Sequence, residues 1–248
     1  MGTTSIDDYD LGQELGHGGF AVVYRARVRS TGREVALKVI DKVKAMLPGG
    51  DPSLTSRIAT EVRVHWGLKH PAVVELIDFF EDARFVYMAL ELCGGGDLYR
   101  HLKTRGPFSE PEAAGFMRQI LAGLTYLHSR GILHRDLKLS NLLLSQDGRR
   151  LRISDFGLAV MLRDGQEERH TICGTPNYMA PEVQDEGYGL SADLWSAGCL
   201  VYVMVTGRAP FQGQRVGDTL SNVRSGAYTV PDGLSPCASD FMECMLQL

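Results

Sequence analysis

The sequence lacks a long hydrophobic run, has few cysteines and carries no excess of positive charge. Its longest apolar segment, residues 194–205, is well short of the roughly 20 residues that a membrane-spanning helix needs. The five cysteines are odd in number and form no C-x-x-C pair, which predicts free thiols in a reducing compartment. A net charge of −4 argues against a general nucleic-acid binder. We therefore expect a cytoplasmic protein with no nucleic-acid or membrane partner.

The order of local patterns along the chain indicates an α+β fold. The 248 residues are enough for one large domain or for two lobes that share an interface. Alternating apolar and polar residues predict a hairpin over 20–40 and another strand over 84–92, with a loop at 47–53 between them. A capping box at 109–112 precedes a long helical pattern. The first part of the chain is therefore mainly strand, and the remainder is mainly helix.

A glycine-rich stretch, LGHGGFAVVY, occupies residues 15–24. Gly16 and Gly18 begin a G-x-G-x-x-G pattern, but Ala21 stands where the third glycine belongs. By itself the stretch fits a hairpin turn as well as a loop that holds phosphates. A Rossmann or Walker loop leads from a strand into a helix, whereas these glycines lead from one strand into another, so both of those sites are excluded.

Lys38 follows on the next strand, in the sequence VALK. Ala36 shares its face of the strand, because residues two apart point the same way. A small residue beside a lysine leaves room for a flat base and places an ammonium near phosphates. Taken alone, Lys38 is better explained as a solvated lysine on a strand.

Residues 56–68 have helical spacing, with Ile58, Val62 and His65 on the inner face. Glu61 lies on the same face, because it is three residues after Ile58 and four residues before His65. An unpaired buried charge is costly, so the carboxylate of Glu61 needs a cation as its partner.

Three further motifs follow in order: HRDLKLSN at 134–141, DFG at 155–157 and APE at 180–182. The first matches the kinase catalytic loop at every fixed position. The chain thus resembles a eukaryotic protein kinase over about residues 9–248. The resemblance implies a bilobal fold, with residues 1–8 as a tail, an N-lobe over about 9–92 and a C-lobe over about 93–248. It also implies ATP and Mg²⁺ as cofactors and protein substrates with Ser or Thr acceptors.

The resemblance assigns roles to individual residues of the catalytic centre. Lys38 would hold the α- and β-phosphates and pair with Glu61, and Asp136 would orient the substrate hydroxyl and take its proton. Asn141 and Asp155 would hold magnesium. Lys138 would contact the γ-phosphate, and together with Thr175 it marks the serine/threonine class.

The nucleotide pocket follows from the same resemblance. Glu91 and Cys93 would offer backbone groups to the adenine, Leu90 would guard the pocket behind it, and Asp97 would lie near the ribose. The other expected ATP-binding residues line the lid and the two walls of the pocket; they are Leu15, Gly16, Gly18, Val23, Ala36 and Leu143.

Other motif residues are expected to have structural or regulatory roles. Asp193 resembles the residue that supports the backbone of the catalytic loop. A packed column through both lobes is expected at His65, Leu76, His134 and Phe156. Thr171 would be phosphorylated in the activation segment, with Arg135 as the partner of the phosphate. Cys173 is either a redox switch or an incidental thiol.

Finer features narrow the resemblance to the polo-like kinases, which carry alanine at the third glycine position. The hinge ELC, FSEPEA and HTICGTPNYMAPEV resemble the Sak subgroup, whose members control centriole duplication. That subgroup implies a centrosomal location, and self-association through polo boxes if the full-length protein carries them. Aurora-like kinases, calcium/calmodulin-kinase-like enzymes and a non-catalytic kinase-like binding module are the alternatives.

The chain stops at FMECMLQL, which leads us to expect that the C-terminal end of the C-lobe is missing. In the family an arginine from the final helices would neutralise Glu182. We therefore expect a buried Glu182 without a cation, and Phe241, Met242 and Met245 exposed on the last helix.

Overall fold

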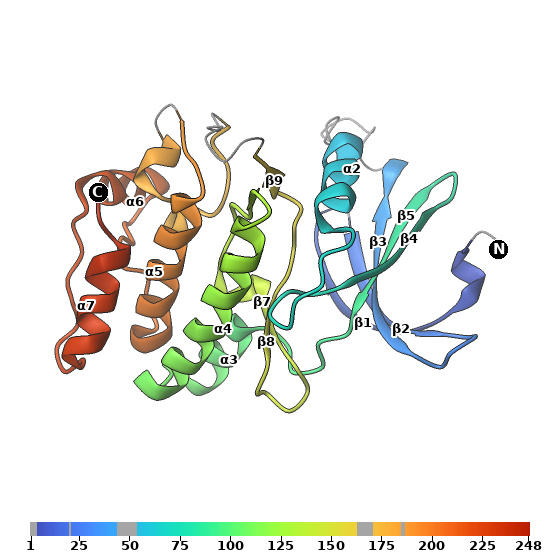
Figure 1. Cartoon of the computed structure of the whole chain (residues 1–248), viewed down its shortest axis with the longest axis horizontal. Coiled ribbons are helices and arrows are strands. Elements are labelled where there is room, and N and C mark those ends of the chain that lie inside the picture. The colour runs from blue at the N-terminus through green and yellow to red at the C-terminus, as the bar shows by residue number, and fades with distance from the viewer. Residues whose placement is uncertain (1–3, 20, 44–53, 163–170, 185–186) are drawn as a thin grey trace.

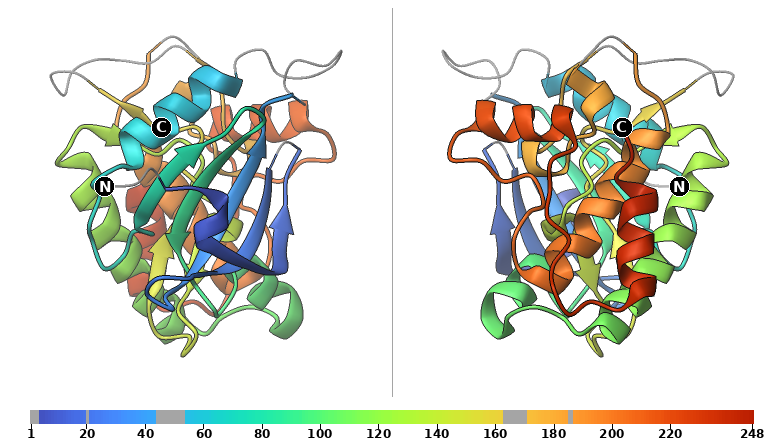
Figure 2. Two further views of the ribbon diagram at one scale, coloured as in Figure 1. Left: turned by 90° about the vertical axis from the view of Figure 1, so that its right-hand side faces the viewer. Right: turned by 90° about the vertical axis from the view of Figure 1, so that its left-hand side faces the viewer.

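A computed structural model describes residues 4–19, 21–43, 54–162, 171–184 and 187–248. The loop predicted at 47–53 lies outside the described residues. A β-sheet lies at one end of the molecule, as the two end views show (Figure 2). Helices α5 (Ser191–Thr206), α6 (Val216–Ser225) and α7 (Pro236–Met245) lie at the other end. Among the described residues, no helix combines the length and the apolarity that crossing a bilayer requires.

The N-terminal part contains a five-stranded antiparallel sheet with the strand order β1-β2-β3-β5-β4 (Figure 1). The predicted hairpin and the predicted later strand are both present in it. The strands are β1 (Tyr9–His17), β2 (Ala21–Val28), β3 (Glu34–Asp41), β4 (Leu76–Glu81) and β5 (Phe85–Glu91).

Helix α2 (Leu54–His65) lies beside this sheet (Figure 1). Its predicted inner face is confirmed, since Ile58, Glu61 and His65 are buried and Val62 is half-buried against the core. Before β1, Ser5 caps a short 3₁₀ turn, η1 (Ile6–Asp8), and Ile6 packs against the core of the sheet. Part of the segment predicted as a tail is therefore structured.

The C-terminal part is mainly helical. Its core lies between α4, α5 and the small strand pair β7–β8, and a second strand pair joins β6 to β9. The helices are α3 (Leu98–Arg105), α4 (Glu110–His128), α5 (Ser191–Thr206), α6 (Val216–Ser225) and α7 (Pro236–Met245). The short elements are β6 (Ile132–Leu133), η2 (Leu139–Asn141), β7 (Leu142–Leu144), β8 (Leu151–Ile153), β9 (Val160–Met161), η3 (Pro176–Tyr178) and η4 (Pro181–Gln184).

Helix α4 begins as predicted. Ser109 is its N-cap, and both the backbone N–H and the hydroxyl of Ser109 donate to the carboxylate of Glu112, at 2.9 and 2.8 Å. Helix α5 is buried along most of its length, as its continuous apolar sequence predicts.

Helix α7 packs closely on α5. This contact corrects the expectation that the apolar face of the last helix is exposed. A Cβ atom added to Gly198 of α5 would lie 2.7 Å from the Cβ of Met245. Met242 is fully buried, and Phe241 and Met245 are half-buried, so the prediction that this face is exposed is wrong. The prediction of a buried Glu182 is also wrong: it is half-buried, and Ser191 Oγ donates to it at 3.2 Å.

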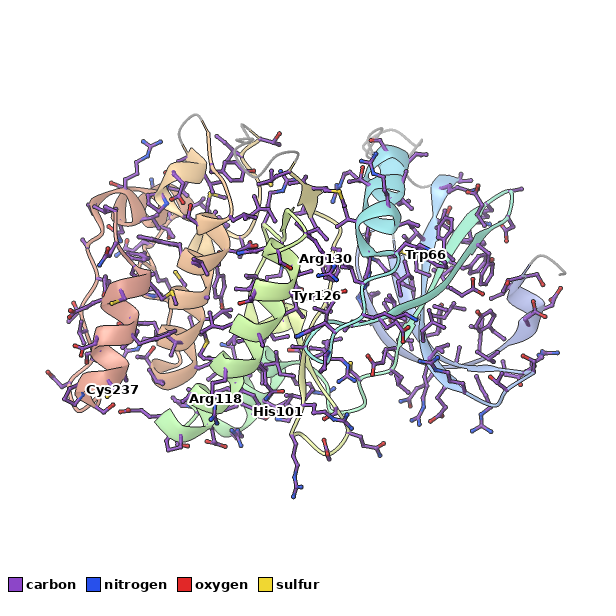
Figure 3. All side chains as sticks on the ribbon, viewed as in Figure 1. Trp66, His101, Arg118, Tyr126, Arg130 and Cys237 are labelled. Atoms are coloured by element: carbon purple, nitrogen blue, oxygen red, sulfur yellow. The ribbon has the colours of Figure 1, made fainter. Side chains whose placement is uncertain are left out.

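Two connections join the sheet to the helices. In the first, which links α2 to β4, the backbone N–H of Lys69 donates to the hydroxyl of Tyr126 on α4 at 2.8 Å, and the Arg130 guanidinium lies 3.8 Å from the Tyr126 ring centroid (Figure 3). In the second, Gly95 follows β5 and its N–H donates to Leu144 O. A Cβ atom on Gly95 would lie 2.3 Å from Ser145 O, so this crossing requires glycine.

Candidate active site

One buried carboxylate, that of Asp193, holds the backbone of the loop that follows β6. Asp193 is 1% exposed, and it accepts hydrogen bonds from the backbone N–H groups of His134 (2.9 Å) and Arg135 (3.0 Å) and from the ring of His128 (2.9 Å). Arg135 has a φ of 69°, a left-handed conformation that costs energy in a residue other than glycine. The two backbone bonds stabilise this conformation, which confirms the expected supporting role of Asp193.

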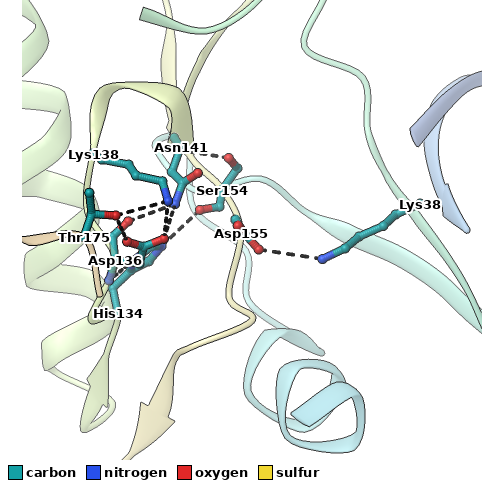
Figure 4. Close-up of polar contacts among 8 residues, drawn as sticks. All are labelled: Lys38, His134, Asp136, Lys138, Asn141, Ser154, Asp155 and Thr175. Atoms are coloured by element: carbon teal, nitrogen blue, oxygen red, sulfur yellow. Dashed lines mark hydrogen bonds and ion pairs between the residues drawn. The ribbon is translucent and has the colours of Figure 1, made fainter. Parts of the chain in front are cut away.

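That conformation presents Asp136 to a cluster of polar groups (Figure 4). Its Oδ2 atom lies 2.6 Å from Lys138 Nζ, and its Oδ1 atom accepts from the Thr175 hydroxyl at 2.7 Å. Lys138 Nζ also donates to Thr175 Oγ1 at 3.3 Å. Asp136 is 8% exposed, so these contacts fix the direction of a largely desolvated carboxylate.

Asn141 and Asp155 lie next to this cluster. The amide nitrogen of Asn141 donates to the backbone oxygen of Asp136 at 2.8 Å and to its Oδ2 at 3.3 Å, which turns the amide oxygen away from Asp136. Ser154 joins the two segments, because its N–H and its hydroxyl both donate to Asn141 O at 2.9 Å. Asp155 also has a left-handed conformation, with a φ of 64°.

Lys38 connects the sheet to this centre. Its ammonium lies 2.7 Å from Glu61 Oε1 and 3.7 Å from Asp155 Oδ1, so the cation that the buried Glu61 required is Lys38. Burial by itself would lower the pKa of Lys38, but the carboxylates of Glu61 and Asp155 outweigh it and raise that pKa. The surrounding protein would likewise raise the pKa of the Asp155 carboxyl, although this side chain is 49% exposed, and the nearby charge of Lys38 lowers that pKa instead. Both groups are therefore charged at neutral pH.

The predicted packed column is confirmed as core. The ring of Phe156 lies 4.4 Å from that of His65 and 5.2 Å from that of His134, and Leu76 is also buried. Burial lowers the pKa of His65 to about 4, and His65 Nε2 lies 2.7 Å from Val74 O. His65 is therefore neutral and supports the position of Phe156 beside Asp155.

Four of the residues predicted to bind ATP share one face of the sheet. In the strand register, Val23 is opposite Lys38 and Ala36 is opposite Leu90, and cross-strand partners share a face. Each of these side chains is half-buried, as expected for the wall of an open site. Leu143 is half-buried on β7, and Leu15 is 46% exposed on β1.

Cys93 and Asp97 continue this wall beyond β5. Burial, followed by the charge of Glu91, raises the pKa of the Cys93 thiol to about 11, so Cys93 is an unreactive thiol. Asp97 caps α3, with Oδ1 accepting from Arg100 N–H at 2.8 Å, and it forms a β-bridge to Leu143.

Gly16 and Gly18 test whether the site fits a nucleotide. A Cβ atom on Gly16 would meet no atom of the chain within 4 Å, and one on Gly18 would meet only Ala21 O, at 4.0 Å. Neither glycine has a positive φ. Neither packing nor backbone geometry within the described chain therefore requires glycine here. The open space leaves room for a phosphate to approach the backbone closely, so the lid is compatible with ATP.

The donor set also fits Mg²⁺ better than a metal held entirely by protein. Among the described residues, no group of three or more His, Cys, Asp or Glu side chains could hold a metal ion. Magnesium is usually bound by one or two carboxylates, with substrate phosphates and water as the other ligands. Asp155, whose side chain is 49% exposed, and the Asn141 amide oxygen match that arrangement.

Sequence reasoning missed two residues of the site. Tyr188 joins Arg135 to the activation segment: its hydroxyl accepts from Arg135 Nη1 at 3.1 Å and donates to Thr171 O at 2.6 Å. Arg152 forms an ion pair with Glu91, with a closest distance of 2.5 Å. The only local sign of a role for Arg152 was its place between two apolar residues of a short strand, Leu151 and Ile153. That pattern does not reveal Glu91 as the partner.

The fold and the site define a protein kinase domain. The protein kinase domain family matches residues 9–248, and the chain belongs to that family. Membership implies the use of ATP, Mg²⁺ and protein substrates. The chain is also similar to the serine/threonine-protein kinase PLK4 of Drosophila melanogaster, with 46% identity over 245 residues, or 98% of this chain and 31% of that protein.

PLK4 of Xenopus tropicalis is 47% identical over 243 residues, or 97% of this chain and 25% of that protein. The chain therefore spans about a third or less of the length of these curated relatives. The resemblance to serine/threonine kinases of the polo-like group is confirmed.

Proposed function

We propose that this domain transfers the γ-phosphoryl group of Mg–ATP to Ser or Thr hydroxyls of protein substrates. One observation carries the proposal. The side chains of Asp136, Lys138 and Thr175 are joined to one another by hydrogen bonds of 2.6–3.3 Å. This cluster lies beside Asn141 and Asp155. A carboxylate in that position can accept a hydroxyl proton while an adjacent ammonium stabilises negative charge.

Each residue has a separate part in this proposal. Asp136 orients the acceptor hydroxyl and takes its proton, and Thr175 keeps the carboxylate in the required direction. Lys138 is close enough to Asp136 to neutralise charge on a phosphoryl oxygen next to it. Catalysis then comes mainly from positioning and electrostatics, as expected for phosphoryl transfer.

The nucleotide would be held by both lobes. Lys38, oriented by Glu61, binds the α- and β-phosphates, while Asn141 and Asp155 hold Mg²⁺, which neutralises phosphate charge when bound. The backbone of Glu91 and Cys93 binds adenine between Ala36 and Leu143. Gly16 and Gly18 are supported in the lid role by the free space where their Cβ atoms would lie.

Asp136→Asn tests the proposed function, with transfer of radiolabelled phosphate to a protein acceptor as the assay. General-base catalysis contributes about 10²–10⁴-fold, so we expect kcat to fall by about that factor while ADP affinity stays unchanged. The matched control is Asp240→Asn, because Asp240 is an exposed aspartate on α7. No transfer by the wild-type chain would favour the alternative of a kinase-like binding module, and a fully active Asp136→Asn would refute the role of Asp136.

Activation would depend on Thr171. Thr171 is exposed and connects through Tyr188 to Arg135, which supports phosphorylation of its hydroxyl with Arg135 as the partner of the phosphate. A phosphate would add about −1.5 to −2 charge next to this guanidinium.

The whole protein is proposed to act in centriole duplication and to reside at the centrosome. The similarity to PLK4 and the resemblance to the Sak subgroup support this proposal. Self-association through polo boxes applies if the full-length protein carries them. Imaging of the tagged full-length protein tests the location, and a signal that never coincides with a centriole marker would refute it.

A further inference from the structure

Strand β8 holds the N-lobe at two neighbouring residues. The backbone of Ile153 bonds to the segment before β4, with Ile153 N–H donating to Ala72 O at 2.8 Å and Val74 N–H donating to Ile153 O at 2.9 Å. The side chain of Arg152 reaches to the other crossing point and binds Glu91 at the end of β5. One short strand therefore contacts both connections between the lobes.

The Arg152–Glu91 pair is bidentate and sheltered. Arg152 Nε donates to Glu91 Oε2 at 2.6 Å, and Nη2 lies 2.5 Å from Oε1. The two side chains are 13% and 27% exposed. Two parallel bonds from a planar guanidinium fix orientation as well as distance, so the pair joins the lobes in one defined geometry.

The position of Arg152 connects it to both ends of the nucleotide site. It is opposite Leu143 in the β7–β8 register, so both side chains lie on the same face of that pair. Asp155 follows three residues later in the chain. Glu91, for its part, follows Leu90 and precedes Cys93 at the edge of the expected adenine pocket. The charges of Glu91 and Arg152 both affect the pKa of Cys93, in opposite directions.

We propose that Arg152 is a positioning residue, which holds the hinge at Glu91 at a fixed distance from the strand that leads to Asp155. This inference rests on the proposed kinase function. A nucleotide must contact the hinge through its base and Asp155 through its metal at the same time. Loss of the pair lets the hinge and Asp155 move relative to each other. Nucleotide affinity then falls, while the rate of the chemical step stays nearly constant.

The test is calorimetric titration of Mg–ADP into Arg152→Leu. We expect about tenfold weaker binding, which corresponds to about 1.4 kcal/mol. Arg152→Lys keeps one charged bond and should lose less, and the double swap Glu91→Arg/Arg152→Glu should restore most of the affinity. Arg25→Leu is the matched control, because Arg25 forms a similar bidentate pair with Glu34 at 2.9–3.0 Å but within the sheet. It should bind Mg–ADP like the wild type.

Kinetics and melting temperature complete the test. A rise in KM for ATP with nearly constant kcat supports positioning. Unchanged ADP affinity in Arg152→Leu, even with a lower melting temperature, overturns the inference and leaves a purely structural pair. Tighter binding or a higher kcat also overturns it, because the pair would then restrain the lobes. ADP affinity does not depend on transfer, so failure of the proposed function remains distinguishable.

Discussion

Replacing Thr175 with valine removes one hydroxyl from the catalytic cluster and conserves its shape. The Thr175 hydroxyl donates to Asp136 Oδ1 at 2.7 Å and accepts from Lys138 Nζ at 3.3 Å. A hydrogen bond to a charged group is worth about 1.5–3 kcal/mol. If this contact holds Asp136 in its productive direction, its loss lowers kcat by about 10- to 150-fold.

The assay is steady-state transfer to a protein acceptor at saturating ATP, compared among wild type, Thr175→Val and Thr175→Ser. Serine keeps the hydroxyl and should retain most of the activity. The KM for ATP should stay within about twofold, because Thr175 contacts the catalytic loop and does not line the expected adenine pocket. A valine variant with wild-type kcat, or a serine variant as impaired as valine, would refute the reasoning.

Three further predictions concern activation, packing and pH. Thr171→Ala should lower activity by about tenfold or more, through loss of a charge-assisted bond, and mass spectrometry of active enzyme with unmodified Thr171 would contradict the switch. Gly198→Ala should lower the melting temperature, since overpacking against Met245 costs about 1–3 kcal/mol and outweighs a helix-propensity gain of about 1 kcal/mol. Gly115→Ala, which meets no atom within 4 Å, should raise it, and a shift of the same sign in both would count against the α5–α7 contact. Hydrogen bonds from Ser109, and then Arg105, lower the pKa of Glu112 from 4.5 to about 2, so Glu112→Gln should destabilise the protein at pH 7. Because the folded pKa is depressed, that gap in melting temperature should narrow as the pH falls from about 4.5 towards 2, and a gap independent of pH would refute it.

The sequence alone determined the features that depend on local spacing. The hairpin over 20–40 follows from period-two alternation, and the start of α4 follows from Ser109 and Glu112, three residues apart. The buried face of α2 follows from the helical period, and it led to the correct expectation that Glu61 needs a cation. The catalytic loop at 134–141 was recognisable because its fixed residues are close together in the chain.

Tertiary packing decided the contacts between distant segments. Nothing near Arg152 in the sequence indicates Glu91, and nothing near Tyr188 indicates Thr171. Glu182 was expected to be buried without a cation, and its half-exposed position beside Ser191 follows from how η4 and α5 lie in the folded chain. A hydrogen bond or an ion pair depends on ångström-scale positions that are set by the packing of both lobes. The period of a strand or helix fixes which face a side chain occupies, but it cannot say which residue from elsewhere in the chain will meet it there.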